Sequence, residues 1–91
     1  MKKIVFSSKA VADLTRLKNF VVEKNPNAAI TITNHLKKDI KKISKHPDIG
    51  LPVKGMISIR DFFILSYITR YKIEDDAIII LRIWHHKEDW K

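Results

Sequence analysis

Apolar residues recur in the first half of the chain with the spacing of two amphipathic helices. One set is separated by four, three and four residues, which places it on one face of a helix from about Lys9 to Glu23. Its members are Ala10, Leu14, Leu17 and Val21. Asn25-Pro26 opens a second helix, since proline is tolerated at the first helical position, and Pro47 ends it near Lys45. Its apolar positions are Ala29, Ile32, Leu36, Ile40 and Ile43. The short connection predicts an antiparallel helical hairpin.

The remaining segments predict short strands. Ile4–Phe6 favours a first strand, after which Ser7 or Ser8 supplies a hydroxyl that caps the first helix. A loop from His46 to Met56 contains two prolines and both glycines. Three strands separated by tight turns follow and predict an antiparallel meander, at Ile57–Ile64, Tyr67–Ile73 and Ala77–Trp84.

The order of these elements defines an α+β fold class, β-α-α-β-β-β, over a single domain of residues 1–91. The helical hairpin is expected to pack on one face of a small antiparallel sheet, leaving the other face for solvent or a partner.

Composition narrows the classes of partner. Lys and Arg number 18 against 10 Asp and Glu, giving a formal net charge of +8, which favours nucleic acid, an anionic membrane or an acidic protein. The absence of cysteine excludes disulfides and thiolate metal sites. The apolar start is too short for a signal segment, and no stretch approaches the roughly 20 apolar residues of a spanning helix. We therefore expect a cytoplasmic protein with no membrane partner.

Several short motifs, in order along nearly the whole chain, resemble the RelE/ParE family of type II toxin–antitoxin toxins. The early motifs are Phe6-Ser7, Ala10, Asp13-Leu14, Asn25-Pro26, Ala28-Ala29, Leu51-Pro52 and Gly55. The later ones are Arg60-Asp61-Phe62, the strand Tyr67–Ile73, Ile80–His85 and Asp89-Trp90. The resemblance implies a toxin held inactive by a cognate antitoxin in a hetero-oligomer. It also implies one of two targets: a ParE-like toxin binds DNA gyrase, whereas a RelE-like toxin cuts messenger RNA, usually on the ribosome.

Cleaving RNA without a metal requires a base, an acid and cations that stabilise the phosphorane. The candidate set is Arg60, Arg82, His85 and Lys87, beside His86. By resemblance the set is incomplete, because Ile68 stands where the RNA-cleaving branch usually has a basic residue. If this branch is right, His85→Ala or Arg82→Ala should abolish cleavage and leave the fold intact.

Whether these cations converge depends on strand register. Period two places Ile78, Ile80, Arg82 and Trp84 on one side of the last strand and Ile79, Leu81, Ile83 and His85 on the other. If Arg60, Arg70 and Arg82 share a face, they form a cationic patch beside Trp84. The alternative is a solvated sheet face whose cations only discourage edge pairing.

The other polar clusters have a structural and a functional interpretation each. Adjacent His85 and His86 point to opposite sides of a strand, so we expect no metal and no cofactor. The outer face of the second helix is lysine-rich: it carries Lys37, Lys38, Lys41, Lys42 and Lys45. Such a face is usually solvated; its functional alternative is contact with phosphate or an acidic protein. No aromatic residue interleaves these lysines, which argues against base stacking.

We interpret the sequence as a ParE-like toxin that binds and inhibits gyrase without being an enzyme. The expected target-binding residues are Arg60, Arg82, Trp84, His85, Lys87 and Trp90. Candidates for antitoxin binding are Leu14, Leu17 and Val21, which are equally suited to the core. The alternatives are a RelE-like messenger RNA endonuclease, a degenerate toxin that only binds antitoxin, and a nucleic-acid-binding module.

Overall fold

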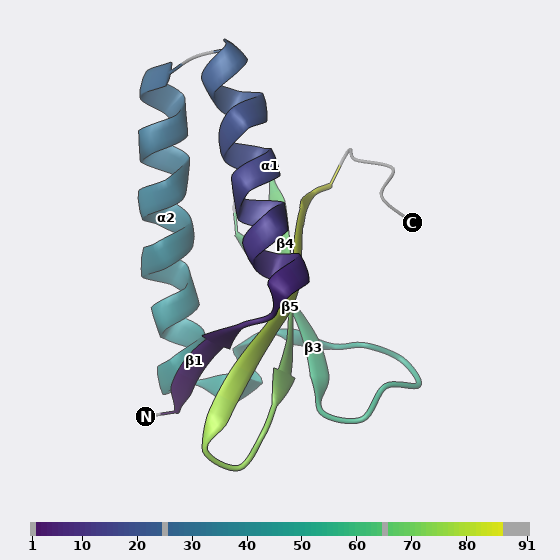
Figure 1. Cartoon of the computed structure of the whole chain (residues 1–91). Helices are drawn as coiled ribbons and strands as arrows, with labels where there is room; N and C mark the ends of the chain where they lie inside the picture. The colour runs from purple at the N-terminus through teal and green to yellow at the C-terminus, as the bar shows by residue number, and fades with distance from the viewer. Residues whose placement is uncertain (1, 25, 65, 87–91) are drawn as a thin grey trace.

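A computed structural model describes residues 2–24, 26–64 and 66–86 (Figure 1). The elements in chain order are β1 (Lys3–Phe6), α1 (Ser8–Lys24), α2 (Pro26–Lys45), a 3₁₀ turn η1 (Pro47–Ile49), β2 (Leu51–Pro52), β3 (Ile59–Ile64), β4 (Tyr67–Ile73) and β5 (Ala77–His85). The α+β class and the expected helices, with their limits to within about a residue, are confirmed. Within the described residues, no helix combines the length and apolar character needed to cross a bilayer.

The strands form one sheet in the order β1-β5-β4-β3-β2. The meander β3-β4-β5 is antiparallel, as expected, but β1 lies parallel to β5, with Ile4 opposite Ile78. The expectation of a wholly antiparallel sheet was therefore wrong. The connection from β1 runs through both helices and the meander before β5 pairs with it. The sheet also gains a fifth strand, because Leu51-Pro52 pairs with β3 inside the segment expected to be a loop.

The two helices stand side by side against one face of the sheet (Figure 1). Their apolar stripes form the core with alternate residues of β3, β4 and β5. The buried members are Ala10, Leu17, Leu36, Ile40, Ile43, Ile64, Tyr67, Tyr71, Ile78, Ile80 and Ile83. The Ser7 hydroxyl accepts a hydrogen bond from the Ala10 amide at 3.0 Å and so caps the N-terminus of α1. Ser7 is one of the two serines that the sequence offered for this role.

A β-bulge in β5 changes which residues face the helices. Arg70 lies opposite Arg82 and Tyr71 lies opposite Ile80, so Leu81 is the extra residue between two paired positions. Because a bulge shifts the alternation by one residue, Ile83 joins Ile78 and Ile80 in the core. The expectation that Ile78 and Ile80 share a side with Arg82 and Trp84 was wrong for this reason.

The Tyr71 side chain fixes the segment that connects α2 to β2. Its hydroxyl accepts a hydrogen bond from the Gly50 amide at 2.9 Å and donates one to the Pro47 carbonyl at 2.6 Å. A Cβ added to Gly50 would lie 2.8 Å from the same hydroxyl oxygen, so glycine is needed for this close approach. Burial is the main reason that the pKa of Tyr71 is raised, and the neutral hydroxyl is therefore the form that holds the segment at ordinary pH.

Replacing Tyr71 by phenylalanine is expected to lower the free energy of unfolding by about 1–3 kcal/mol, because it leaves the Gly50 amide and the Pro47 carbonyl without their partner. Urea unfolding measures the change. Thr69→Val is the matched control on the same strand: Thr69 is fully buried, and its hydroxyl oxygen has no hydrogen-bond partner among the described residues. We expect Thr69→Val to be neutral or stabilising. Equal losses in the two variants would contradict the role assigned to Tyr71.

Candidate functional site

The sheet face opposite the helices, here called the open face, carries side chains in three rows that run across the strands. Residues paired in an antiparallel ladder project from the same side of the sheet, so the register defines each row. The inner row is Ile59, Lys72, Ile79 and Val5; the middle row is Leu51, Asp61, Arg70 and Arg82; the outer row is Phe63, Ile68 and Trp84.

The three charged residues of the middle row, Asp61, Arg70 and Arg82, form an array of four charges together with Asp13 of α1. Arg70 and Arg82 lie directly opposite each other on β4 and β5, an arrangement that is destabilising for like charges alone. Each arginine is paired with a carboxylate on the side away from the other arginine. Arg70 Nε and Nη2 donate to the two oxygens of Asp61 at 2.8 and 3.0 Å, and Arg82 forms the equivalent fork with Asp13. These four charges balance one another, with two bidentate pairs flanking the arginine contact, and Arg16 adds a third cation at Asp13.

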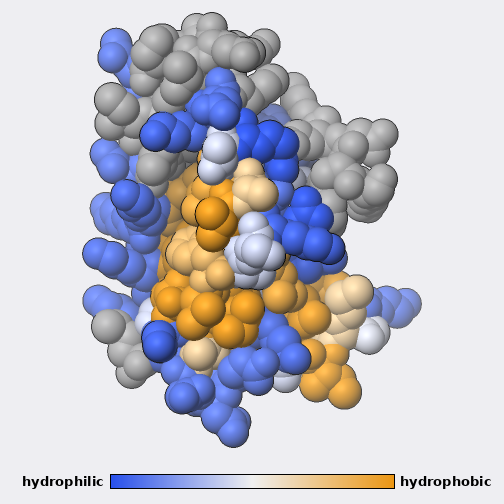
Figure 2. Space-filling model, viewed as in Figure 1, coloured by the Kyte–Doolittle hydropathy of each residue, from blue (hydrophilic) through white to orange (hydrophobic). Residues whose placement is uncertain are grey.

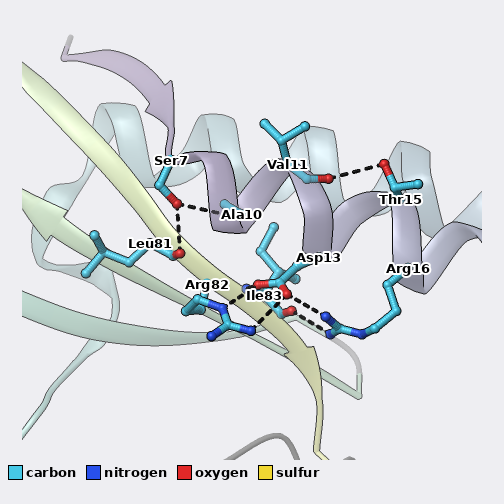
Figure 3. Close-up of polar contacts among 9 residues, drawn as sticks. All are labelled: Ser7, Ala10, Val11, Asp13, Thr15, Arg16, Leu81, Arg82 and Ile83. Carbon is cyan, nitrogen blue, oxygen red and sulfur yellow. Dashed lines mark hydrogen bonds and ion pairs between the residues drawn. The ribbon is translucent and has the colours of Figure 1, made fainter.

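Asp13 joins α1 to the edge of β5 (Figure 3). Its Oδ2 accepts from Arg82 Nε at 2.8 Å and from the Ile83 amide at 2.9 Å; its Oδ1 accepts from Arg82 Nη2 at 3.0 Å and from Arg16 Nη1 at 2.5 Å. The Asp13 side chain is only 2% exposed. Four donors on one buried carboxylate make it a structural anchor between the helix and the sheet.

The charge of Asp13 is stabilised by these donors. Burial alone would raise the pKa of this carboxyl, but the hydrogen bonds from Arg82, the Ile83 amide and Arg16 outweigh it and hold the pKa below its usual value. Asp13 was not among the expected site residues. The signal was present in the sequence, because Asp13 lies three residues after Ala10 and four before Leu17, on the apolar face of α1, where an unpaired charge would be costly.

The outer row is apolar and runs from an exposed edge to a covered centre. Phe63 on β3 is 56% exposed, whereas Ile68 and Trp84 are 8% and 7% exposed. The guanidinium carbon of Arg70 lies 5.4 Å from the ring centroid of Trp84, a cation–π distance that connects the middle and outer rows. Trp84 is therefore held in place by its neighbours, and Phe63 is the accessible aromatic group among the described residues of this face.

The expected site residues do not all gather on this face. Arg82 and Trp84 do, but Arg60 pairs with Tyr71 and projects from the helix-facing side, where Arg60 Nη1 donates to the Gly50 carbonyl at 2.7 Å. The conditional patch of three arginines is therefore not formed. His85 pairs with Tyr67, also on the helix-facing side. Lys87 and Trp90 lie outside the described residues.

His85 sits in a group of rings at the end of β5. Its ring meets that of Tyr67 edge-on at 5.2 Å and stacks on that of His86 at 4.6 Å. The exposed His86 ring has Nδ1 at 3.1 Å from the Ser66 carbonyl. No group of three or more His, Cys, Asp or Glu side chains that could hold a metal occurs among the described residues.

The expected antitoxin-binding residues of α1 are mostly internal. Leu17 is 4% exposed and belongs to the core, and Leu14 is partly buried against it. The backbone of Val21 lies in α1, but its side chain is outside what the structure describes. Antitoxin binding by these residues stays a prediction.

Comparison with solved structures identifies the class of fold. The chain is similar to a chain of the chromosomal ParDE toxin–antitoxin system from P. aeruginosa, with a TM-score of 0.82 at 20% identity over 93% of this chain and 96% of that one. It is also similar to a chain of the RelBE2 toxin–antitoxin complex from Mycobacterium tuberculosis, with a TM-score of 0.66 at 22% identity over 92% and 96%.

Residues 4–90 match the family model of the ParE toxin of the type II toxin–antitoxin system parDE, and the chain belongs to this family. Curated relatives include two toxins of Caulobacter vibrioides. Toxin RelE1 is 30% identical, over 93% of this chain and 94% of its own length; toxin RelE3 is 25% identical, over 97% and 98%. The RelE/ParE resemblance of the sequence is thereby confirmed, and the chain is a toxin of a type II toxin–antitoxin module.

Asp13→Asn is expected to lower the free energy of unfolding by about 3–5 kcal/mol, because Arg82 then faces Arg70 with no carboxylate and the buried donors lose their anion. The wild-type anchor is also sensitive to acid. The lowered pKa gives a stability contribution that is present above about pH 4, the ordinary range for Asp, and is lost as pH falls through the folded-state value. The variant should lack this part of the acid dependence, which urea unfolding at a series of pH values measures.

Asp39→Asn is the control for this prediction. Asp39 pairs with Lys42 at 3.1 Å on the outer side of α2, where the lysine side chain is 53% exposed. The lysine of this i,i+3 pair is largely exposed although the Asp39 side chain is only 18% exposed, and a helical pair of this kind contributes less than about 1 kcal/mol. An Asp13 variant no less stable than the Asp39 variant would show that the anchor does not hold the fold together.

Proposed function

We propose that this chain is a ParE-like toxin that inhibits DNA gyrase by binding it, and that a cognate antitoxin neutralises it in a hetero-oligomer. The antitoxin is inferred from the family and from the toxin–antitoxin complexes among its structural relatives. An acidic amphipathic antitoxin segment would complement the net charge of +8. The target-binding surface is assigned to the open face and to the end of β5.

One observation carries the choice of binding over RNA cleavage. Catalysis of phosphoryl transfer by arginine requires cations that are available to the developing negative charge. On the open face, Arg70 and Arg82 are each neutralised by a bidentate carboxylate, and Arg60 lies on the other face with its guanidinium on loop carbonyls. These arginines therefore serve as structural ion pairs and loop contacts, and they do not converge as a catalytic set would.

The residues expected to bind the target remain part of this proposal with different roles. Trp84 and Arg82 hold the open face in shape, and Phe63 offers the accessible ring at its edge. Aromatic side chains of this kind commonly dominate the energetics of an interface. His85, at the end of β5, and Lys87 and Trp90, beyond the described residues, would extend the surface along the chain. Arg60 would act on it only indirectly, through the η1–β2 segment.

The alternative hypothesis, a messenger RNA endonuclease, is supported by the names of the curated relatives, which are RelE toxins. Under it, His85 is the residue to test. Arg82→Ala is unsuitable as a catalytic test, since Arg82 is bound to the buried Asp13 and its removal would disturb the fold. We therefore expect Arg82→Ala to disturb the fold, in contrast to the expectation from the sequence that it leaves the fold intact.

Pulse-labelling of cells within minutes of inducing the chain without its antitoxin distinguishes the targets. We expect thymidine incorporation to stop before amino-acid incorporation, with filamentation and a damage response. Purified chain should then inhibit supercoiling by gyrase and increase cleaved DNA. Early arrest of protein synthesis, abolished by His85→Ala, would instead establish the endonuclease. Unimpaired growth together with tight antitoxin binding would identify a degenerate toxin.

Phe63→Ala is expected to weaken gyrase inhibition by about tenfold or more, the effect of losing a moderate hot spot, while leaving stability nearly unchanged because the ring is largely exposed. Supercoiling assays over a concentration series measure the loss. Val11→Ala on α1 is the matched control: Val11 is also about half exposed, at 51%, but lies on the helical layer. Full inhibitory activity in the Phe63 variant would exclude the outer row from the interface.

A further inference from the structure

The outer face of α2 carries a continuous polar stripe with a strong positive charge. Leu36, Ile40 and Ile43 are buried on the inner face together with Ser44, and a set of polar positions at helical spacing points outward. The stripe, as the name is used here, consists of Thr31, Asn34, His35, Lys38, Lys41, Lys42 and Lys45, with Lys37 beside it, all of them exposed. Thr31 and Lys45 are separated by about 21 Å along the helix axis.

The charge of the stripe is concentrated rather than diluted by acidic residues. Between Asn34 and His46, five lysines and one aspartate carry a net charge of +4, half of the formal charge of the chain. The single aspartate, Asp39, has a side chain only 18% exposed and is engaged by Lys42. Figure 2 shows hydrophilic side chains along the flank that α2 forms. An exposed acidic cluster among the described residues, Glu74, Asp75 and Asp76, lies in the β4–β5 turn instead.

The dipole of the helix accounts for only part of this arrangement. Lysines in the last turn, Lys42 and Lys45, favourably meet the negative end of α2. That effect fades within one turn, so it gives no reason for Lys37, Lys38 and Lys41. At the other end of the stripe, an open depression is lined, among the described residues, by Thr31, Asn34, His35 and Lys38. Hydroxyl, amide and cationic donors in one row are the groups that contact phosphate and sugar oxygens.

We propose that the stripe binds the phosphate backbone of double-stranded DNA, without reading its sequence. The buried face of α2 packs in the core, and lysines four residues apart, such as Lys37, Lys41 and Lys45, lie about 6 Å apart along the axis. A duplex presents a phosphate every 3.4 Å or so on each strand, so such a row meets a regular line of negative charge. The stripe, Thr31 to Lys45, contains no Phe, Tyr or Trp, and His35 is its single ring that could stack on a base, which favours a duplex over a single strand. This surface lies on the helical layer and is separate from the open face.

The test measures binding of the purified chain to a fluorescent 20-base-pair duplex of arbitrary sequence, by anisotropy over a series of salt concentrations. The variant Lys37→Gln, Lys38→Gln, Lys41→Gln removes three charges from α2. The control Lys9→Gln, Lys18→Gln, Lys54→Gln removes three charges from exposed positions elsewhere, so both proteins carry the same net charge. Glutamine retains helix propensity close to that of lysine, and thermal unfolding checks that both variants fold.

We expect the α2 variant to bind the duplex at least tenfold more weakly than the control does. The plot of log K against log salt should also become shallower, its negative slope decreasing in magnitude by about 2–3, because each lost phosphate contact removes about 0.9 from it. Equal losses in the two variants would reduce the effect to net charge and overturn the proposal. So would tighter binding of single-stranded RNA or of an acidic peptide through the same lysines, or no duplex binding at low salt. Gyrase inhibition is measured separately, and either result stands without the other.

Discussion

The structure depends on how the backbone N–H and C=O groups on the β1 side of β5 are hydrogen-bonded beyond the end of β1. β1 pairs with β5 only as far as Phe6 and Ile80, so the backbone groups beyond would be left on a buried edge. The side chains of Ser7, which precedes α1, and of two residues in the first half of α1 provide the hydrogen bonds instead. The Ser7 hydroxyl donates to the Leu81 carbonyl at 2.9 Å, Asp13 accepts from the Ile83 amide, and Arg16 donates to the Ile83 carbonyl at 3.3 Å (Figure 3). Side chains of α1 thus provide the hydrogen bonds to β5 that a longer β1 would have made with its backbone.

This anchor determines what the open face can do. Bringing Asp13 into the protein requires a cation, and Arg82 supplies it from the opposite side of the sheet; Arg70, opposite Arg82, is then balanced by Asp61. A chain of this size has little stability in reserve and cannot leave such charges unpaired. The arginines that would be most useful for chemistry are therefore committed to the fold. What the face retains for recognition is shape, the ring of Phe63 and the flanking apolar row.

Much of this architecture follows from the sequence, and the parts that do not have physical causes. Periodicity is a local property, so the limits of α1 and α2 and the core roles of Leu36, Ile40 and Ile43 could be predicted. The phase of β5 could not, since alternation assumes a regular ladder and the bulge at Leu81 shifts it by one residue. The strand β2 could not be predicted because a segment of two residues that includes a proline has no strand pattern. The separation of Arg60 from Arg70 required the register across the β3–β4 turn.

Charge and recognition are distributed over different layers of the molecule. On the open face Asp61 and Asp13 balance the two arginines of the middle row, whereas half of the formal net charge of the chain lies on α2, on the helical layer. Long-range attraction chiefly affects the rate of encounter with an anionic partner, whereas desolvated contacts chiefly affect how long a complex lasts. Under the two proposals, α2 would concentrate the toxin along DNA, and the sheet would hold the topoisomerase found there. Because the inner face of α2 packs on the sheet, the two surfaces keep a fixed orientation, and a single small domain can meet a protein and its DNA together.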